Sequence, residues 1–447
     1  MPASAPESSG AAAPAPYCAI DFGTSNSAIA VPAAADGAIG LVELEPGYRT
    51  MPTAVFYFAE GPEVDGPPRA FGRAAVAAYV DGIDGRLMRS MKSILGSSLL
   101  EQSTDVGGGR SARYLDVVAG YLKRLKTLAQ GASSSAAPIE RVVLGRPVFF
   151  VDDDPQRDAQ AQAALETAAR AVGFREVQFQ YEPIAAAFDY ERSASQEQVV
   201  LVADIGGGTS DFSIVRVGPD RMHRLDRKAD ILANHGVHIA GTDFDRHVEL
   251  SSILGEFGFR AFGPSVKGAP PREVPSAVYF DLATWHLINT VYSPARVAEL
   301  RNMRVFYGDP KHHQRLMTVL TQRLGHELAA RAEQAKIDVA EGDDTLIDLS
   351  HAEPGLSVRL AERDAVTAID ADMERIVQAA RETVRDAGLR ASDIDALYFT
   401  GGSTGLRLLA ERIAACFPQA RAVRGDRFAS VATGLGLHAK RLFGNAG

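Results

Sequence analysis

Short apolar runs alternate with longer amphipathic stretches along most of the chain. The runs at residues 18–22, 141–144 and 177–181 have the length and apolar content of buried strands. Residues 114–130 carry leucine and valine at the three- and four-residue spacing that places them on one face of a helix. This alternation predicts an α/β protein with mixed sheets.

The central part of the chain contains the clearest predicted hairpin. Residues 199–204 and 210–217 are β-rich runs joined by three consecutive glycines at 206–208. Longer periodic stretches at 313–340 and 362–387 predict long helices. Further expected elements are a helix from Pro155 to Gly173, a helix that starts at Pro183, a strand at 396–400, two closing helices, and loops at 103–113, 131–138 and 263–275.

The composition is that of a folded globular protein and excludes several classes. Of the 447 residues, 46% are hydrophobic and 23% are charged, close to the globular average. The net charge of −9 argues against a nucleic-acid partner, and no apolar run is long enough to span a membrane. Cys18 and Cys416 lie far apart, which predicts no disulfide framework and fits a cytoplasmic location. Residues 1–16, rich in alanine, proline and serine, predict a disordered leader.

Two glycine turns repeat within the chain. IDFGTSNS begins at Ile20 and DIGGGTSD begins at Asp204, and each places an aspartate at the end of an apolar strand, before glycine and threonine. Backbone N–H groups that converge in such a turn form a concave site for phosphate oxygens. A carboxylate at the strand end suits a hydrated Mg²⁺ ion. Two ordinary hairpins are the alternative interpretation, but the matching residues favour a nucleotide held between two similar domains.

Six motifs resemble, in the same order, those of the heat shock protein 70 (Hsp70, DnaK-type) chaperones of the actin-like ATPase superfamily. They are the two glycine turns, YEPIAAA from Tyr181, HIAGTDFD from His238, AEQAK from Ala332 and FTGGST from Phe399. The resemblance covers about residues 17–440. Any one motif is weak evidence, but six in a shared order are specific.

The resemblance implies an actin-like ATPase fold, with two RNase H-like lobes built on mixed sheets around a nucleotide cleft. We expect lobe I at residues 17–197, and lobe II at 198–428 with a helical insertion at about 246–340. A C-terminal helix at 429–447 is expected to return to lobe I. Full members of the family add a peptide-binding domain, for which this chain is expected to leave no room. LGRPVFF, from Leu144, fits the short YegD-type relatives, which consist essentially of an ATPase region.

The resemblance also implies which residues hold ATP and Mg²⁺ and which catalyse hydrolysis. Lys92 matches a lysine that reaches the γ-phosphate, and Glu182 matches a carboxylate beside the metal and the attacking water. Asp21 and Asp204 are the expected metal-side carboxylates. The expected catalytic residues are Lys92, Glu182, Asp204, Thr209 and Asp211. The expected nucleotide-binding residues are Asp21, Gly23, Thr24, Ser25, Asn26, Gly206, Gly207, Gly208, Gly241, Glu333, Lys336, Gly401, Gly402 and Ser403.

Several of these roles have a plainer structural alternative, and the base-binding side departs from the family pattern. Glu182 suits a helix N-terminus, Lys92 suits a solvated helix face, and Asp211 suits a turn. Where the family has two arginines that stack on adenine, this chain has Ile337 and Gly405. Such stacking is worth about 0.5–2 kcal/mol, so weaker or altered base recognition is expected.

The expected function is that of an Hsp70-like molecular chaperone ATPase, in which ATP closes the two lobes and thereby switches a protein partner. The expected partners are ATP and ADP, a client polypeptide and a cochaperone, with no nucleic acid and no membrane. The aromatic, proline-containing segment 260–313 is the candidate partner surface, and a local insertion packed on lobe II is its alternative. A filament-forming actin-like ATPase and a sugar-kinase-like or exopolyphosphatase-like phosphotransferase are the alternative functions.

Overall fold

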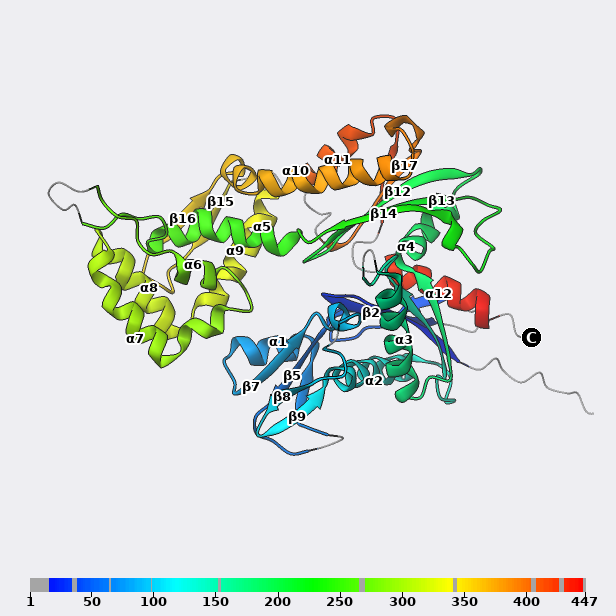
Figure 1. Ribbon diagram of the computed structural model, residues 1–447, viewed down its shortest axis with the longest axis horizontal. Coiled ribbons are helices and arrows are strands. Elements are labelled where there is room, and N and C mark those ends of the chain that lie inside the picture. Colours follow the sequence, from blue (N-terminus) through cyan, green and yellow to red (C-terminus); the bar gives the residue numbers. More distant parts are fainter. Residues whose placement is uncertain are drawn as a thin grey trace, which may run out of the picture.

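The computed structural model describes residues 16–33, 38–63, 66–97, 99–151, 154–264, 270–340, 344–402, 407–425 and 430–444. Two main sheets lie one above the other in Figure 1, with helices around them and a helical part to one side. This arrangement confirms the predicted α/β class with mixed sheets. Within the described part of the chain, every helix is too short or too polar to span a bilayer.

The first sheet gathers strands from the first 181 residues. Its order is β11-β10-β1-β2-β3, with β4 also paired to β2. The central strand β1 runs parallel to β10 and antiparallel to β2. The strands are β1 (Tyr17–Phe22), β2 (Asn26–Pro32), β3 (Ile39–Leu41), β4 (Thr50–Pro52), β10 (Arg141–Arg146) and β11 (Glu176–Tyr181).

The second sheet repeats the pattern of the first. Its order is β14-β13-β12-β17-β18, and its central strand β12 runs antiparallel to β13 and parallel to β17. The antiparallel pair of β12 and β13 confirms the predicted hairpin. The strands are β12 (Gln198–Ile205), β13 (Ser210–Val217), β14 (Ile231–Val237), β17 (Ala396–Thr400) and β18 (Arg421–Arg424). Each glycine turn therefore follows the central strand of its own sheet.

Helices cover both sheets and fill the space between them (Figure 1). The apolar residues of α2 (Tyr114–Ala132) and α3 (Pro155–Ala171) form one core with the first sheet, whereas α10 (Glu362–Asp386) and α11 (Arg407–Cys416) pack on the second. As predicted, α3 begins after Asp154, whose side chain accepts a hydrogen bond from the Arg157 N–H.

The helices α4 (Glu182–Glu191) and α12 (Ser430–Phe443) lie between the two sheets and share a core with strands of both. They cross at very short range, because a Cβ at Gly434 of α12 would lie only 1.9 Å from the carbonyl oxygen of Ala185.

Two smaller parts flank the sheets. One contains β5 (Ala54–Phe58), β6 (Arg69–Phe71), α1 (Gly72–Val80), β7 (Gly85–Arg89), β8 (Ser103–Gly107) and β9 (Arg110–Arg113). The helical part contains α5 (Gly241–Val248), α6 (Ala277–Leu282), α7 (Pro294–Asn302), α8 (Pro310–Gln322), α9 (Gly325–Ala340), β15 (Thr345–Asp348) and β16 (Ser357–Leu360). Short 3₁₀ or π turns are η1 (Met91–Ile94), η2 (Lys228–Asp230), η3 (Glu249–Ile253), η4 (Leu254–Phe257), η5 (Ile288–Tyr292), η6 (Met303–Phe306) and η7 (Ala391–Asp393).

The structure corrects two sequence expectations. The single helix expected at 313–340 is wrong. α8 ends at Gln322, the next residue, Arg323, has a left-handed φ of 56°, and α9 begins at Gly325. The loop expected at 103–113 is a hairpin of β8 and β9. Its three consecutive glycines, 107–109, all have positive φ and form the turn. The expected leader at residues 1–16 lies, apart from Pro16, outside the described residues.

Candidate functional site

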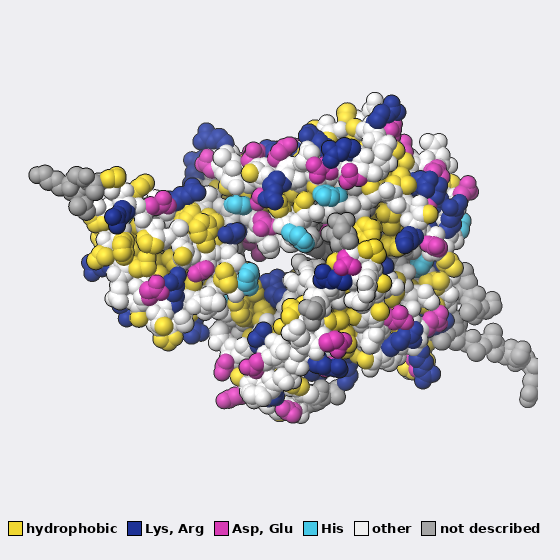
Figure 2. Space-filling view, viewed as in Figure 1, with side chains coloured by type: hydrophobic (Ala, Val, Ile, Leu, Met, Phe, Trp, Pro, Cys, Tyr) yellow, Lys and Arg dark blue, Asp and Glu magenta, His cyan; other side chains and the backbone are white. Residues whose placement is uncertain are grey.

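A cavity of about 770 Å³ lies between the two glycine turns. Figure 2 shows this face of the molecule hollowed between the upper and lower halves of the view. The cavity is lined by every described residue that the sequence analysis placed in a site, whereas Ser403 lies outside the described residues. These lining residues are Asp21, Gly23, Thr24, Ser25, Asn26, Lys92, Glu182, Asp204, Gly206, Gly207, Gly208, Thr209, Asp211, Gly241, Glu333, Lys336, Gly401 and Gly402.

The first glycine turn connects β1 directly to β2. A Cβ at Gly23 would lie 2.2 Å from the carbonyl oxygen of Asn26, so only glycine fits there. Thr53 holds the turn from outside: its Oγ1 donates to the carbonyl oxygen of Gly23 at 2.8 Å, and its N–H donates to that of Ser25 at 2.9 Å. These bonds fix the backbone of the turn beside the cavity.

The second glycine turn is held by the start of α5. The N–H of Gly206 donates to the carbonyl oxygen of Thr209 at 2.9 Å and closes the hairpin. Thr242 donates both its N–H and its hydroxyl to the carbonyl oxygen of Gly207, each at 2.8 Å. A Cβ at Gly207 would lie 3.2 Å from Oγ of Ser25. The two turns therefore face each other at close range.

Lys92 and Glu182 form an ion pair at the cavity wall. Lys92 lies in η1 and Glu182 is the first residue of α4, and Nζ of Lys92 donates to Oε1 of Glu182 at 2.5 Å. Their side chains are only 9% and 16% exposed. Lys92 is therefore not the solvated helix lysine of the plainer interpretation. Glu182 does lie at a helix N-terminus, as the plainer interpretation of that residue has it, and it contacts Lys92 as well.

The carboxylates at the two strand ends repel one another. The pKa of Asp21 is raised to about 8, first by burial and then by the negative charge of Glu182. The pKa of Asp204 is raised to about 7 by burial, by Asp211 opposite it in the hairpin, and by Glu182.

Burial acts to lower the pKa of Lys92, but the charges of Glu182 and Asp21 outweigh burial, so the pKa of Lys92 is raised overall. Lys92 therefore stays an ammonium ion. The same ammonium acts to lower the pKa of both Asp21 and Asp204. It does not cancel the repulsion, because four carboxylates face this one ammonium, and the site therefore favours a further cation.

The donor set fits a hydrated Mg²⁺ ion. Across the described ranges, no group of three or more His, Cys, Asp or Glu side chains is arranged to hold a metal ion by itself. Asp21 and Asp204 instead offer carboxylate oxygens, and their pKa values are raised first by burial and then by the neighbouring carboxylates. Mg²⁺ is usually bound by one or two carboxylates together with water and phosphate oxygens.

Residues of α9 and the residues that follow β17 form another part of the cavity wall. Gly401 has φ of +87°, and a Cβ there would lie 2.5 Å from Oδ1 of Asp204. Lys336 of α9 forms an ion pair with Asp245 of α5 at 2.5 Å. Ile337, which stands where the family has a stacking arginine, lines the cavity and is 44% exposed.

The sequence analysis gave no role to several polar residues of this cavity, among them Asp245, Asn234 and Thr242. Asp245 was quoted only as part of a motif, yet burial raises its pKa to about 6 while Lys336 acts to lower it. Asn234 lines the cavity from β14 and accepts a hydrogen bond from Ser213 at 2.7 Å. Thr242 holds the second turn. The spacing of GTDFD from Gly241 was the signal for Asp245 and Thr242, whereas nothing in the local sequence pointed to Asn234.

Comparisons with known proteins show what the chain is similar to. A family model described as Hsp70 protein matches residues 17–258. Chaperone protein HscA from Salmonella agona is 25% identical over 434 residues, and Chaperone protein HscA homolog from Shewanella sp. (strain MR-4) is 25% identical over 451 residues. Each match covers 95% of this chain and 58% of the relative, so the chain spans less than two thirds of the length of these curated relatives.

Proposed function

Because the chain belongs to the Hsp70 family and has its actin-like ATPase fold, we propose that it binds ATP with Mg²⁺ between the two glycine turns and hydrolyses it. One observation carries this proposal: the two aspartate-led turns face each other across one cavity, with the Lys92–Glu182 pair at its wall. A linear triphosphate with its cation needs such opposed N–H groups and carboxylates.

Each turn holds one side of the phosphate chain in this proposal. The N–H groups of Thr24 and Ser25 donate from the first turn, and those of Gly207, Gly208 and Thr209 donate from the second. The ammonium of Lys92 offsets the charge that develops on the transferred phosphoryl group. A Mg²⁺ ion held near Asp21 and Asp204 would neutralise phosphate charge.

The remaining polar groups orient the attacking water. Glu182, Asp204 and Asp211 are the carboxylates available to accept its proton, and the hydroxyl of Thr209 orients it.

We extend the proposal to a chaperone switch. Residues 17–197 form lobe I, residues 198–428 form lobe II, and α12 returns to lobe I, where it packs against β1, β2 and β10. Because the two turns belong to different sheets, bound γ-phosphate draws the lobes together, and its loss lets them separate. A client polypeptide or a cochaperone binds or is released in response to this change.

The test measures phosphate release and ATP affinity for the wild type, Lys92→Ala and Asp204→Asn. Lys311→Ala is the control, because Lys311 is exposed on α8 and does not line the cavity. We expect both site variants to lose hydrolysis and the control to keep it. Hydrolysis retained in both site variants removes the assignment of the site. Turnover that requires an added small acceptor identifies a phosphotransferase instead, and nucleotide-dependent sedimentation of polymers identifies a filament former.

A further inference from the structure

The helix α4 connects the cavity to a second buried cluster of charges. Its first residue, Glu182, lines the cavity, and its last residue, Glu191, is only 1% exposed. Ten residues at 1.5 Å each make a helix about 15 Å long. A buried carboxylate at the far end of this helix needs partners, and its partners lie in the connection between β13 and β14.

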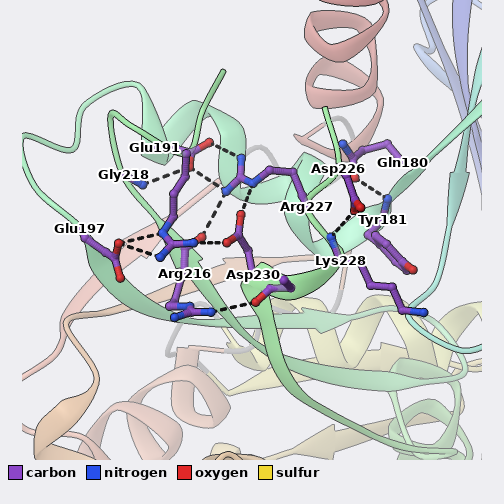
Figure 3. A network of polar contacts seen from close by, with 12 residues as sticks. Gln180, Tyr181, Glu191, Glu197, Arg216, Gly218, Asp226, Arg227, Lys228 and Asp230 are labelled. Carbon is purple, nitrogen blue, oxygen red and sulfur yellow. Dashed lines mark hydrogen bonds and ion pairs between the residues drawn. The ribbon is translucent and has the colours of Figure 1, made fainter. Parts of the chain in front are cut away.

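Arg227 is the main partner of Glu191 (Figure 3). Its Nη1 donates to Oε2 of Glu191 at 3.0 Å and its Nη2 donates to Oε1 at 2.8 Å, a two-pronged contact. Its Nε donates to Asp230, and its Nη2 also donates to the carbonyl oxygen of Arg216 at 3.1 Å. The Arg227 side chain is 0% exposed.

At its far edge the cluster reaches the surface through Glu197. The N–H of Gly218 donates to Oε1 of Glu191 at 3.0 Å. Asp230, which is 2% exposed, pairs with Arg221. Arg221 pairs at 2.8 Å with Glu197, whose side chain is 55% exposed. Glu197 is therefore the solvated end of this network, and its buried end is Arg227, which binds Glu191 of α4.

Stability alone does not account for such a cluster. Replacement of a buried ion pair by apolar side chains of similar volume often leaves stability unchanged or increases it. The two-pronged contact instead restricts the orientation of the Glu191 carboxylate and the position of α4, because a guanidinium fork fits a carboxylate in few orientations. The other contacts of α4 are mainly apolar and include both small and large side chains. Such packing has no directional hydrogen bonds that fix the orientation of the helix end. The buried side chains are those of Ile184, Ala185, Ala186, Ala187, Phe188 and Tyr190.

We infer that Arg227 is a positioning residue for the proposed ATPase reaction. Arg227 holds Glu191 and thereby sets the position of α4 along the helix axis. This position keeps the carboxylate of Glu182, at the other end of α4, in contact with Lys92. This inference rests on the proposed function. A displacement of about 1 Å in a reacting group can cost up to roughly a hundredfold in rate.

Two variants separate positioning from stability. Arg227→Met/Glu191→Met replaces the buried pair with apolar side chains. Asp230 loses its contact with Arg227 but keeps Arg221 as its partner. Arg227→Lys keeps the charge but loses the fork. We expect kcat for ATP hydrolysis to fall about tenfold in the double variant and about threefold to tenfold in Arg227→Lys, with the Kd for ATP unchanged within about twofold. Glu197→Gln, at the exposed end of the network, is the control and keeps the wild-type kcat.

A wild-type kcat in Arg227→Lys, or in a folded double variant, overturns the inference. If the double variant does not fold, Arg227→Lys alone decides, because it keeps the buried charge balance.

A second measurement keeps the inference testable if the wild type does not hydrolyse ATP. The ¹³Cε NMR signal of Lys92 reports its contact with Glu182 without any turnover. We expect this signal to shift or broaden in Arg227→Lys and to stay unchanged in Glu197→Gln. An unchanged Lys92 signal in Arg227→Lys overturns the positioning role. Absence of hydrolysis in the wild type overturns only the proposed function.

Discussion

The ammonium nitrogen of Lys92 lies 2.5 Å from Oε1 of Glu182, although the two residues are 90 positions apart in the chain. One residue comes from a 3₁₀ turn beside the first sheet and the other begins the helix between the sheets. Substitution of either residue therefore tests whether these two elements form one site.

We expect Lys92→Met to lower kcat for ATP hydrolysis by about a hundredfold, because a charge that stabilises the transition state is lost. The free energy of unfolding should also fall by about 3 kcal/mol, since Glu182 is left without its cation. Lys92→Met/Glu182→Gln should recover most of the stability but none of the activity. Phosphate release and urea unfolding measure the two effects, and a double variant with restored kcat contradicts the assigned role.

Binding of Mg²⁺ should release protons near neutral pH. The raised pKa values of Asp21, about 8, and Asp204, about 7, leave both carboxyl groups partly protonated at pH 7. A cation beside them lowers both pKa values and displaces protons. Titration calorimetry of Mg²⁺ into the protein–ADP complex, in two buffers of different ionisation enthalpy, measures the release. The release should vanish above about pH 9 and in Asp21→Asn/Asp204→Asn, and equal release in that variant counts against the site.

Removal of the Asp204 charge should stabilise the metal-free protein at alkaline pH. The folded pKa of about 7 lies above the unfolded value of about 3.9, so the folded state binds more protons between these values. The contribution of Asp204 to stability is therefore fully present below about pH 4 and lost as pH rises through 7. In EDTA, Asp204→Asn should melt at a higher temperature than wild type at pH 8.5 and at nearly the same temperature at pH 5. A difference in melting temperature that is the same at both pH values would refute this account.

Gly401→Ala should destabilise the protein more than Gly388→Ala. Both glycines have positive φ, +87° and +70°, so both substitutions carry a backbone cost of about 1 kcal/mol. A Cβ at Gly401 would also lie 2.5 Å from Oδ1 of Asp204 and 2.5 Å from the carbonyl oxygen of Ile205, whereas a Cβ at Gly388 meets nothing within 4 Å. Chemical denaturation should show a further loss of about 1–3 kcal/mol for Gly401→Ala. An equal loss of unfolding free energy in the two variants would mean that the backbone moves and relieves the contact of the new Cβ with Asp204 and Ile205.

Trp285 should report movement of the two lobes. It is the single tryptophan of the chain, and its ring stacks on Tyr79 with centroids 4.9 Å apart. Tyr79 belongs to α1 and Trp285 to the helical part, so the stack bridges the two parts that flank the sheets. We expect the tryptophan emission to shift to longer wavelength when nucleotide is removed, and Tyr79→Ala to shift it in the presence of nucleotide. Identical spectra with and without ATP would argue against lobe separation at this contact.

The glycine turns and their strands were predictable because their sequence carries the information locally. Asp21 and Asp204 lie at the ends of apolar strands. The glycines that follow are typical of a tight turn, because glycine tolerates backbone conformations and close contacts that other residues do not. The separate roles of Lys92 and Glu182 were expectations from family resemblance alone, and their ion pair was not predicted. No local pattern places a 3₁₀ turn against the start of a distant helix.

Other features could not be predicted because tertiary contacts decide them. A left-handed arginine at position 323 breaks the expected long helix, and nothing about arginine favours that conformation. The strand β18, RAVR, is mostly exposed and carries no apolar run. Arg227 lies in a charged stretch that suggests a solvated loop, yet it is fully buried by Glu191 and Asp230.

The helix α12, which crosses α4 at Gly434, lies near the C-terminal end of the given sequence but packs on strands from its beginning, and this has a consequence for biosynthesis. β1 begins at Tyr17, but α12, which supplies part of the packing for its inner face, begins only at Ser430. At ~5–20 residues per second, the ribosome takes roughly 20–80 s to travel from one to the other. During that interval the N-terminal sheet emerges with one apolar side lacking its final cover, so the nascent chain itself is a candidate for protection by other cellular factors until synthesis reaches its last helix.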